Sequence, residues 1–221
     1  MQNKTQLCQE HRNIFEVETW YQDKSLYTCS SGCGGLSADA LCKTPSDPEI
    51  LRLSSKLDPG TTHQLAIHLG MEDRHWKDIE YNYPRDGAMV KFFMLIKWRD
   101  SMDGTYKDIA GALTTMSYSP HILCQVRRMK RKQTDIPEMH LDSVPTDEIL
   151  DALAPEIGTL SFQLGIELGR SVPELLTIEH NYKNDLVAQT TDILYKWRND
   201  TSVKATLGIL QQAFFLLTSK G

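Results

Sequence analysis

The feature of this sequence that most constrains its fold is an internal repeat with an offset of 99 residues. Residues 50–100 align with residues 149–199 without a gap, and 16 of the 51 aligned pairs are identical. Ordinary residue usage would give about three identities by chance over such a length. In the first copy the identities cluster at 50–51, 64–70, 79–86 and 97–99. The sequence therefore predicts a duplicated domain.

Each copy has the hydrophobic periodicity of α-helices. In the second copy, Leu186, Thr190, Ile193 and Trp197 follow the spacing of one helical face. Alternation with period two is missing from both copies, which disfavours strands. In the first copy the predicted helices are 47–57, 62–69, 72–82, 86–102, 105–116 and 120–132, with 59–60 as a loop. In the second copy they are 146–154, 161–168, 172–182, 185–199 and 203–218, with 157–159 as a loop. The prediction is an all-α fold of two tandem antiparallel bundles.

Composition and segment boundaries complete this organisation. Hydrophobic residues at 40% and charged residues at 24% are ordinary globular values. We predict a cysteine-containing segment at 1–44, a first bundle at 46–133, a linker at 134–144 and a second bundle at 145–221. Apolar runs are too short to span a bilayer, and the first twenty residues lack the apolar core of a secretory signal. We therefore expect a cytoplasmic protein.

The residues that recur in the two copies resemble the death domain. The resemblance lies in an order of motifs: Leu-x-x-x-Leu-Gly, Ile-Glu, an acidic residue that opens a long helix, and a Trp that closes it. The second copy carries this order in Leu164, Leu168-Gly169, Ile178-Glu179, Asp185, Trp197 and Ala205-Thr206. The first copy has Thr105-Tyr106 at the Ala-Thr position, and both copies lack a Trp before the second helix, where they have His63 and Phe162. Death-effector and caspase-recruitment domains share the six-helix plan and are the alternatives within the superfamily.

The resemblance implies a non-enzymatic adaptor that binds other death-domain proteins in apoptotic or innate-immune signalling. Residues 46–133 carry 14 basic and 11 acidic side chains, and residues 134–221 carry 6 and 13. The net charges are therefore +3 and −7, which favours head-to-tail self-association into a homo-oligomer. A heterotypic partner with a basic death domain is equally compatible. The basic run 127–132 lacks interleaved aromatics, so we expect no nucleic-acid binding. The candidate partner-binding residues are Arg52, Lys56, Asp73, Arg74, Arg85, Arg99, Glu167, Glu174, Lys183 and Asp192.

The helix predicted at 86–102 carries apolar residues on two sides. By register with the second copy, its core face holds Ala88, Lys91, Leu95 and Trp98. A second stripe consists of Met89, Phe92, Phe93 and Ile96. A helix that is apolar on two sides is usually buried on two sides. We expect this stripe to pack against the other copy, with Phe214 and Phe215 as candidates for the opposing surface. The alternative is a shifted register in which the stripe is simply core.

The N-terminal segment differs from the two copies. Residues 13–21 and 26–30 are rich in β-forming residues around a turn, which predicts a hairpin. The candidate ligands of a structural zinc ion on the flanking loops are Cys8, His11, Cys29 and Cys33, with Cys42 as a competing ligand. Disulfides or plain thiols are the alternatives.

Motifs of the common enzyme classes are missing from the sequence: there is no Walker loop, no Gly-x-Ser-x-Gly and no His-Glu-x-x-His. We therefore expect neither catalysis nor a cofactor. The alternative function from another class is a zinc-dependent module that binds nucleic acid or ubiquitin and is carried on a helical platform.

Overall fold

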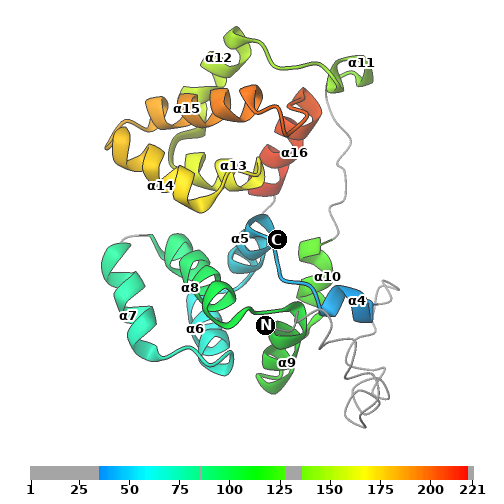
Figure 1. Ribbon diagram of the computed structural model, residues 1–221, viewed down its shortest axis with the longest axis vertical. Coiled ribbons are helices and arrows are strands. Elements are labelled where there is room, and N and C mark those ends of the chain that lie inside the picture. Colours follow the sequence, from blue (N-terminus) through cyan, green and yellow to red (C-terminus); the bar gives the residue numbers. More distant parts are fainter. Residues whose placement is uncertain (1–34, 85, 128–135, 219–221) are drawn as a thin grey trace. The chain divides into compact units, whose positions relative to one another are not determined.

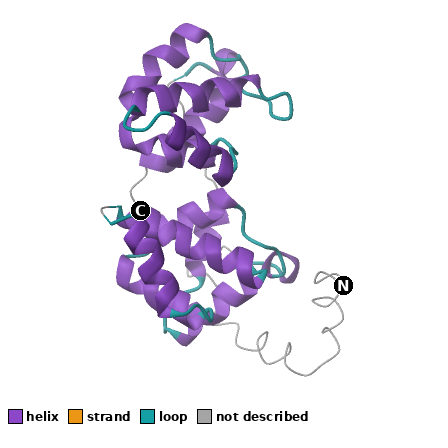
Figure 2. Ribbon diagram, turned by 60° about the vertical axis from the view of Figure 1, so that its left-hand side comes forward, coloured by secondary structure: helices purple, strands orange, loops and turns teal. Residues whose placement is uncertain are grey.

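The computed structural model describes residues 35–84, 86–127 and 136–218 (Figure 1). Figure 2 shows helices and loops in these ranges and no strand. The predicted all-α class is therefore confirmed for the described residues. The chain divides into two compact units, Met1–Met129 and Lys130–Gly221. Within the described part, no helix combines the length and the apolarity needed to cross a membrane.

In the first unit, a short helix precedes a set of longer ones (Figure 1). The described helices are α4 (Ala38–Leu41), α5 (Asp47–Lys56), α6 (Pro59–His68), α7 (Asp73–Asn82), α8 (Gly87–Met102), α9 (Tyr106–Thr115) and α10 (His121–Arg127). Helix α8 is central, because α5, α6 and α7 all pack against it. Helix α10 packs against α5, and α9 packs against α4 and α6. Trp98, Leu95, Ile50 and Leu65 are fully buried and form part of the core.

The second unit repeats this order without a described counterpart of α10. Its elements are α11 (Glu138–Leu141), α12 (Asp147–Ile157), the 3-10 helix η2 (Gly158–Leu160), α13 (Ser161–Glu167), α14 (Val172–Asn181), α15 (Leu186–Asn199) and α16 (Leu207–Thr218). Helix α15 packs against α12, α13 and α14, and α16 packs against α11 and α13. Trp197, Leu194, Leu150 and Leu164 are at the centre of the core.

Two repeated glycines end the second helix of each repeat, as their position predicts. Gly70 follows α6 with φ +85°, and Gly169 follows α13 with φ +82°. These values lie in the left-handed region that glycine enters at no steric cost. In the first unit the amide of Met71 donates to the carbonyl of Ala66 at 2.9 Å, a bond that satisfies an otherwise unpaired helix carbonyl. The sequence therefore locates both helix ends correctly.

Two predicted loops are wrong. Residues 59–60 are the first residues of α6, because Asp58 caps this helix by accepting from the Thr61 amide at 2.9 Å and Pro59 suits a first helical turn. Helix α12 continues past the predicted end at 154 to Ile157, although Pro155 lies inside it. Gly158 then turns the chain with φ +57° directly into η2. At the end of the second unit, α16 begins at Leu207, four residues later than predicted.

The range predicted as a linker carries structure that belongs to the second unit. Residues 136–144 include α11, which packs against α16. The amide of Leu207 at the start of α16 donates to the carbonyl of Ser143 at 2.9 Å. In the first unit, the amide of Tyr106 donates to the carbonyl of Lys43 at 3.0 Å in the same way. The structural repeat therefore begins at α4 and α11, before the range in which the sequences match.

The second apolar stripe of α8 has neighbours inside the first unit. Met89, Phe92 and Ile96 are buried, and Phe93 stacks on Tyr83 with ring centroids 4.7 Å apart. The predicted core position at Ala88 is exposed, so that part of the register is wrong. Lys91 is half-buried, and its Nζ donates to the carbonyl of Leu57 at 2.7 Å. Burial lowers the pKa of this lysine. In the second unit, Phe214 lies at the edge of the core and Phe215 is half-buried. Contact between the stripe and these phenylalanines stays a prediction.

Candidate interaction surface

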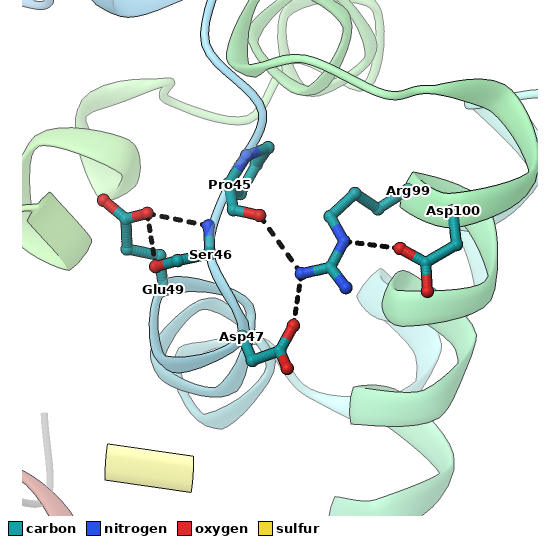
Figure 3. Close-up of polar contacts among 6 residues, drawn as sticks. All are labelled: Pro45, Ser46, Asp47, Glu49, Arg99 and Asp100. Carbon is teal, nitrogen blue, oxygen red and sulfur yellow. Dashed lines mark hydrogen bonds and ion pairs between the residues drawn. The ribbon is translucent and has the colours of Figure 1, made fainter. Parts of the chain in front are cut away.

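Arg99 ties the end of α8 to the start of α5 (Figure 3). Its Nη1 donates to the carbonyl of Pro45 at 3.2 Å and to Asp47 Oδ1 at 2.5 Å. Its Nε donates to Asp100 Oδ1 at 2.8 Å. The side chain of Arg99 is only 13% exposed. The predicted exposure of Arg99 is therefore wrong, because its Nη1 and Nε donate within the first unit, and its role in partner binding stays a prediction.

The first turn of α5 is also capped by hydrogen bonds between its own residues. Glu49 Oε2 accepts from the Ser46 amide at 2.8 Å and from the Ser46 hydroxyl at 2.7 Å, and Figure 3 shows both bonds. The two residues form a capping box. Burial acts to raise the pKa of Glu49, but the hydrogen bonds from Ser46 outweigh it, and the pKa lies below its usual value. Arg127 of α10 adds an ion pair with Glu49 at 3.5 Å. The acidic groups at this end of α5 are therefore matched by cations of the same unit.

Beyond this first turn, α5 carries a basic face. Arg52 and Lys56 are both half-exposed and lie one turn apart. The Nη1 of Arg52 makes a long contact of 3.4 Å with the carbonyl of Val126 in α10. The positive charge of this face therefore comes from Arg52 and Lys56, which the sequence analysis predicted as partner-binding residues.

The second unit repeats the arginine contact at its own first helix. Arg198 pairs with Asp147 at the start of α12 and is 15% exposed. Its guanidinium also lies over the Tyr195 ring, 4.6 Å from the centroid. The contact is more open than in the first unit, because Asp147 is 63% exposed whereas Asp47 is 25% exposed. The repeated Lys-Trp-Arg motif thus supplies a core tryptophan and an arginine that holds the first helix.

The outer face of α12 is acidic where that of α5 is basic. Glu148 and Asp151 are exposed on it. Asp151 stands at the repeat position of Arg52 and accepts from the Tyr195 hydroxyl at 3.0 Å. A hydrogen bond from the Thr146 side chain lowers the pKa of Glu148. One surface position of the repeat therefore has opposite charge in the two units.

The other predicted partner-binding residues are distributed over both units. Asp73, Arg74 and Lys183 are exposed, as predicted. Glu167, Glu174 and Asp192 are half-exposed, and Arg85 lies outside the described residues. Several have ion-pair partners within four residues in the sequence. These pairs are Asp73 with Lys77 at 2.6 Å, Arg74 with Glu72 at 2.8 Å, Glu174 with Arg170 at 3.5 Å and Asp192 with Lys196 at 3.0 Å.

The sequence analysis did not select the acidic residues of α12. Net charge over 134–221 indicates an acidic copy, but it does not say where the charge lies. The available signal was the aligned pair of Arg52 and Asp151, which the 99-residue offset places at one position. Opposite charges at one position of a repeat indicate two surfaces with different partners.

The predicted zinc ligands Cys8, His11, Cys29 and Cys33 lie outside the described residues. Cys42, the competing ligand, is disulfide-bonded. Cys124 in α10 is a buried free thiol. Over residues 35–84, 86–127 and 136–218, no three His, Cys, Asp or Glu side chains are grouped so that they could hold a metal ion.

The described residues thus carry a basic face on α5 in the first unit and an acidic face on α12 in the second, each beside an arginine contact that holds the helix. Comparison with protein-family models, with curated proteins and with solved structures gave no significant match.

Proposed function

We propose that this chain is a non-enzymatic adaptor whose two units are death-domain-like and bind other domains of the same kind. The observation that carries this proposal is the charge reversal at one position of the repeat, with Arg52 on α5 and Asp151 on α12. The order of helices and the repeated tryptophans agree with the sequence resemblance. Duplicated domains with opposite charge at the same place are suited to joining unlike partners.

The simplest partner for the acidic face of α12 is the basic face of α5 on another copy of the chain. Such pairing leaves one face of each kind unused at the ends, so it continues head to tail. Exposed charges interact over roughly 8 Å at physiological ionic strength and over less as salt rises. Association through these faces therefore weakens with salt, whereas association through apolar surfaces does not.

Sedimentation velocity of the full chain at about 50 mM and about 500 mM salt tests this proposal. We expect concentration-dependent assembly at low salt and monomers at high salt. Asp151→Arg and Arg52→Glu each prevent self-assembly. A mixture of the two variants assembles again, because every interface then pairs a basic face with an acidic one, whereas either variant alone brings together faces of like charge. The matched control is Glu179→Arg, since Glu179 is an exposed acid on α14; it assembles as the parent does.

Monomers of the parent chain at low salt and high concentration would exclude self-association. The adaptor proposal then depends on binding to a different death-domain protein. A pull-down with the parent and with Asp151→Arg, read by mass spectrometry, tests it: death-domain proteins captured by the parent and lost with the variant are required. Equal capture by both would show that the face on α12 is not involved.

A further inference from the structure

A cleft of about 450 Å³ lies in the first unit, where α6 and α8 end and α9 begins. Ligand pockets in proteins have volumes of about 300–1,000 Å³. The cleft therefore has the size of a small binding site. It is lined by His68 and Leu69 at the end of α6, by Trp98 and Met102 of α8, and by Lys107, Asp108 and Gly111 of α9.

Part of the cleft wall is apolar. Trp98 is buried and Leu69 is half-buried, whereas Met102 is 49% exposed although its side chain is large and apolar. A methionine side chain is flexible and polarisable, so it adapts to apolar groups of different shape. Gly111 adds no side chain to the wall. These residues favour a ligand that places an apolar side chain in the cleft, because burial removes apolar surface of both molecules from water.

Two side chains with nitrogen donors line the cleft from different helices. His68 of α6 and Lys107 of α9 are exposed, and neither forms an ion pair with another described residue. Asp108 also lines the cleft, but its Oδ2 already accepts from the Thr105 amide at 2.8 Å and from the Thr105 hydroxyl at 2.7 Å. The donors that remain available therefore favour a carboxylate on the ligand, beside the apolar side chain.

The second unit has different side chains at the equivalent positions. The amides of Tyr106 and Leu207 make equivalent backbone hydrogen bonds, which sets an offset of 101 residues between α9 and α16. With this offset for α9 and the offset of 99 for α6, the second unit has Glu167 in place of His68, Gly208 in place of Lys107 and Gln212 in place of Gly111. Both nitrogen donors are replaced there, and an acid is added, so the second unit is not suited to the same ligand.

We infer that the cleft of the first unit binds a short segment of a partner protein in which a large apolar residue is followed by an acidic one. The apolar side chain contacts Leu69, Trp98 and Met102, and the carboxylate accepts from Lys107. Charge complementarity selects the acidic residue, and apolar burial supplies most of the affinity. This inference goes beyond the proposed function, since the cleft lies on α6, α8 and α9 and does not depend on self-association.

NMR titration of the isotope-labelled full chain with the blocked dipeptide acetyl-Leu-Glu-amide tests the inference. This probe contains one apolar side chain and one carboxylate. We expect saturable shifts of amide signals at the end of α6 and the start of α9, with a dissociation constant of about 1 mM. Acetyl-Leu-Gln-amide should bind about threefold more weakly, because it lacks the charge. Acetyl-Ala-Glu-amide should bind about tenfold more weakly, because it buries less apolar surface. Absence of saturable shifts, or equal binding of the three probes, would overturn the inference.

Two variants test whether the cleft is the binding site. Lys107→Gln should bind the glutamate and glutamine probes equally, because the cation that distinguishes them is gone. Gly111→Gln should weaken binding of all three probes by about fivefold or more, because it adds to the cleft the side chain that the second unit has there. The matched control is Gly87→Gln at the start of α8, where a Cβ meets nothing within 4 Å; it binds the probes as the parent chain does.

The inference is wrong if Lys107→Gln still prefers the glutamate probe, or if Gly111→Gln and Gly87→Gln behave alike. Lys107 is exposed, so its substitution leaves the fold intact and provides a result even where a change at Gly111 disturbs α9. Asp151→Arg should bind the probes as the parent does although it does not assemble. Loss of probe binding with intact salt-dependent assembly therefore removes this inference alone, and the reverse result removes the self-association proposal alone.

Discussion

At Gly104, one added methyl group would meet a buried indole ring of the first unit. It follows the left-handed residue Asp103 that ends α8, and its amide donates to the carbonyl of Arg99 at 2.9 Å. A Cβ built on Gly104 lies 2.3 Å from Cζ2 and 2.5 Å from Cη2 of Trp98. Carbon atoms in contact are normally about 3.5–4.0 Å apart. Gly104→Ala therefore forces an overlap of more than about 1 Å with an indole ring.

The magnitude follows from how little the ring can move. Trp98 is 1% exposed, and it is a rigid side chain enclosed by the core of the first unit. Overpacking of a filled core costs about 1–3 kcal/mol, and a clash with a rigid ring belongs at the upper end of that range. We expect Gly104→Ala to lower the free energy of unfolding of the first unit by about 3 kcal/mol. The matched control is Gly87→Ala at the start of α8, where a Cβ meets nothing within 4 Å. This change stabilises by about 0.5 kcal/mol, because alanine loses less backbone entropy than glycine on folding.

Hydrogen exchange measured by mass spectrometry reports the stability of each unit separately within one chain. Amides of α5 and α8 that exchange only by unfolding of the first unit should exchange roughly a hundredfold faster in Gly104→Ala. Amides of α12 and α15 should be unchanged. If the first unit exchanges at the parent rate, or if Gly104→Ala and Gly87→Ala behave alike, the packing of Trp98 against residue 104 is wrong.

Two further predictions concern the polar contacts. Arg99→Met should lower the free energy of unfolding of the first unit by about 2 kcal/mol, since it leaves half-buried acceptors without a donor. Arg198→Met should lower the free energy of unfolding of the second unit by only about 0.5 kcal/mol, because its partner Asp147 is mostly exposed. Urea unfolding of both variants checks the inequality, and equal losses contradict it. Hydrogen bonds from Ser202 hold the pKa of Asp200 at about 2, below the usual 3.8. Its contribution to stability is therefore present above pH 3.8 and lost as the pH falls toward 2. Asp200→Asn should remove that part of the acid sensitivity of the second unit, and parallel acid unfolding of parent and variant would refute the assignment.

The sequence alone determined the helical class, the positions of most helices and the equivalence of the two halves. Periodicity and turn residues carry this information because both act within a few residues of the chain. Gly70 and Gly169 illustrate it: a helix end that needs positive φ favours glycine whatever the tertiary structure. Trp98 and Trp197 were likewise recognisable as core residues, because the aligned positions keep a large apolar side chain.

Only the tertiary structure decided which polar side chains are available to a partner. Arg99 satisfies a sequence pattern for exposure, yet Asp47, 52 positions away, withdraws it from solvent. Asp151 is exposed on α12 and accepts from the hydroxyl of Tyr195, 44 positions away, which no local pattern reports. The same holds for residues 136–144, which a backbone hydrogen bond from Leu207 to Ser143 attaches to α16. Local sequence determines where helices form, whereas contacts between distant positions determine which of their faces remain exposed.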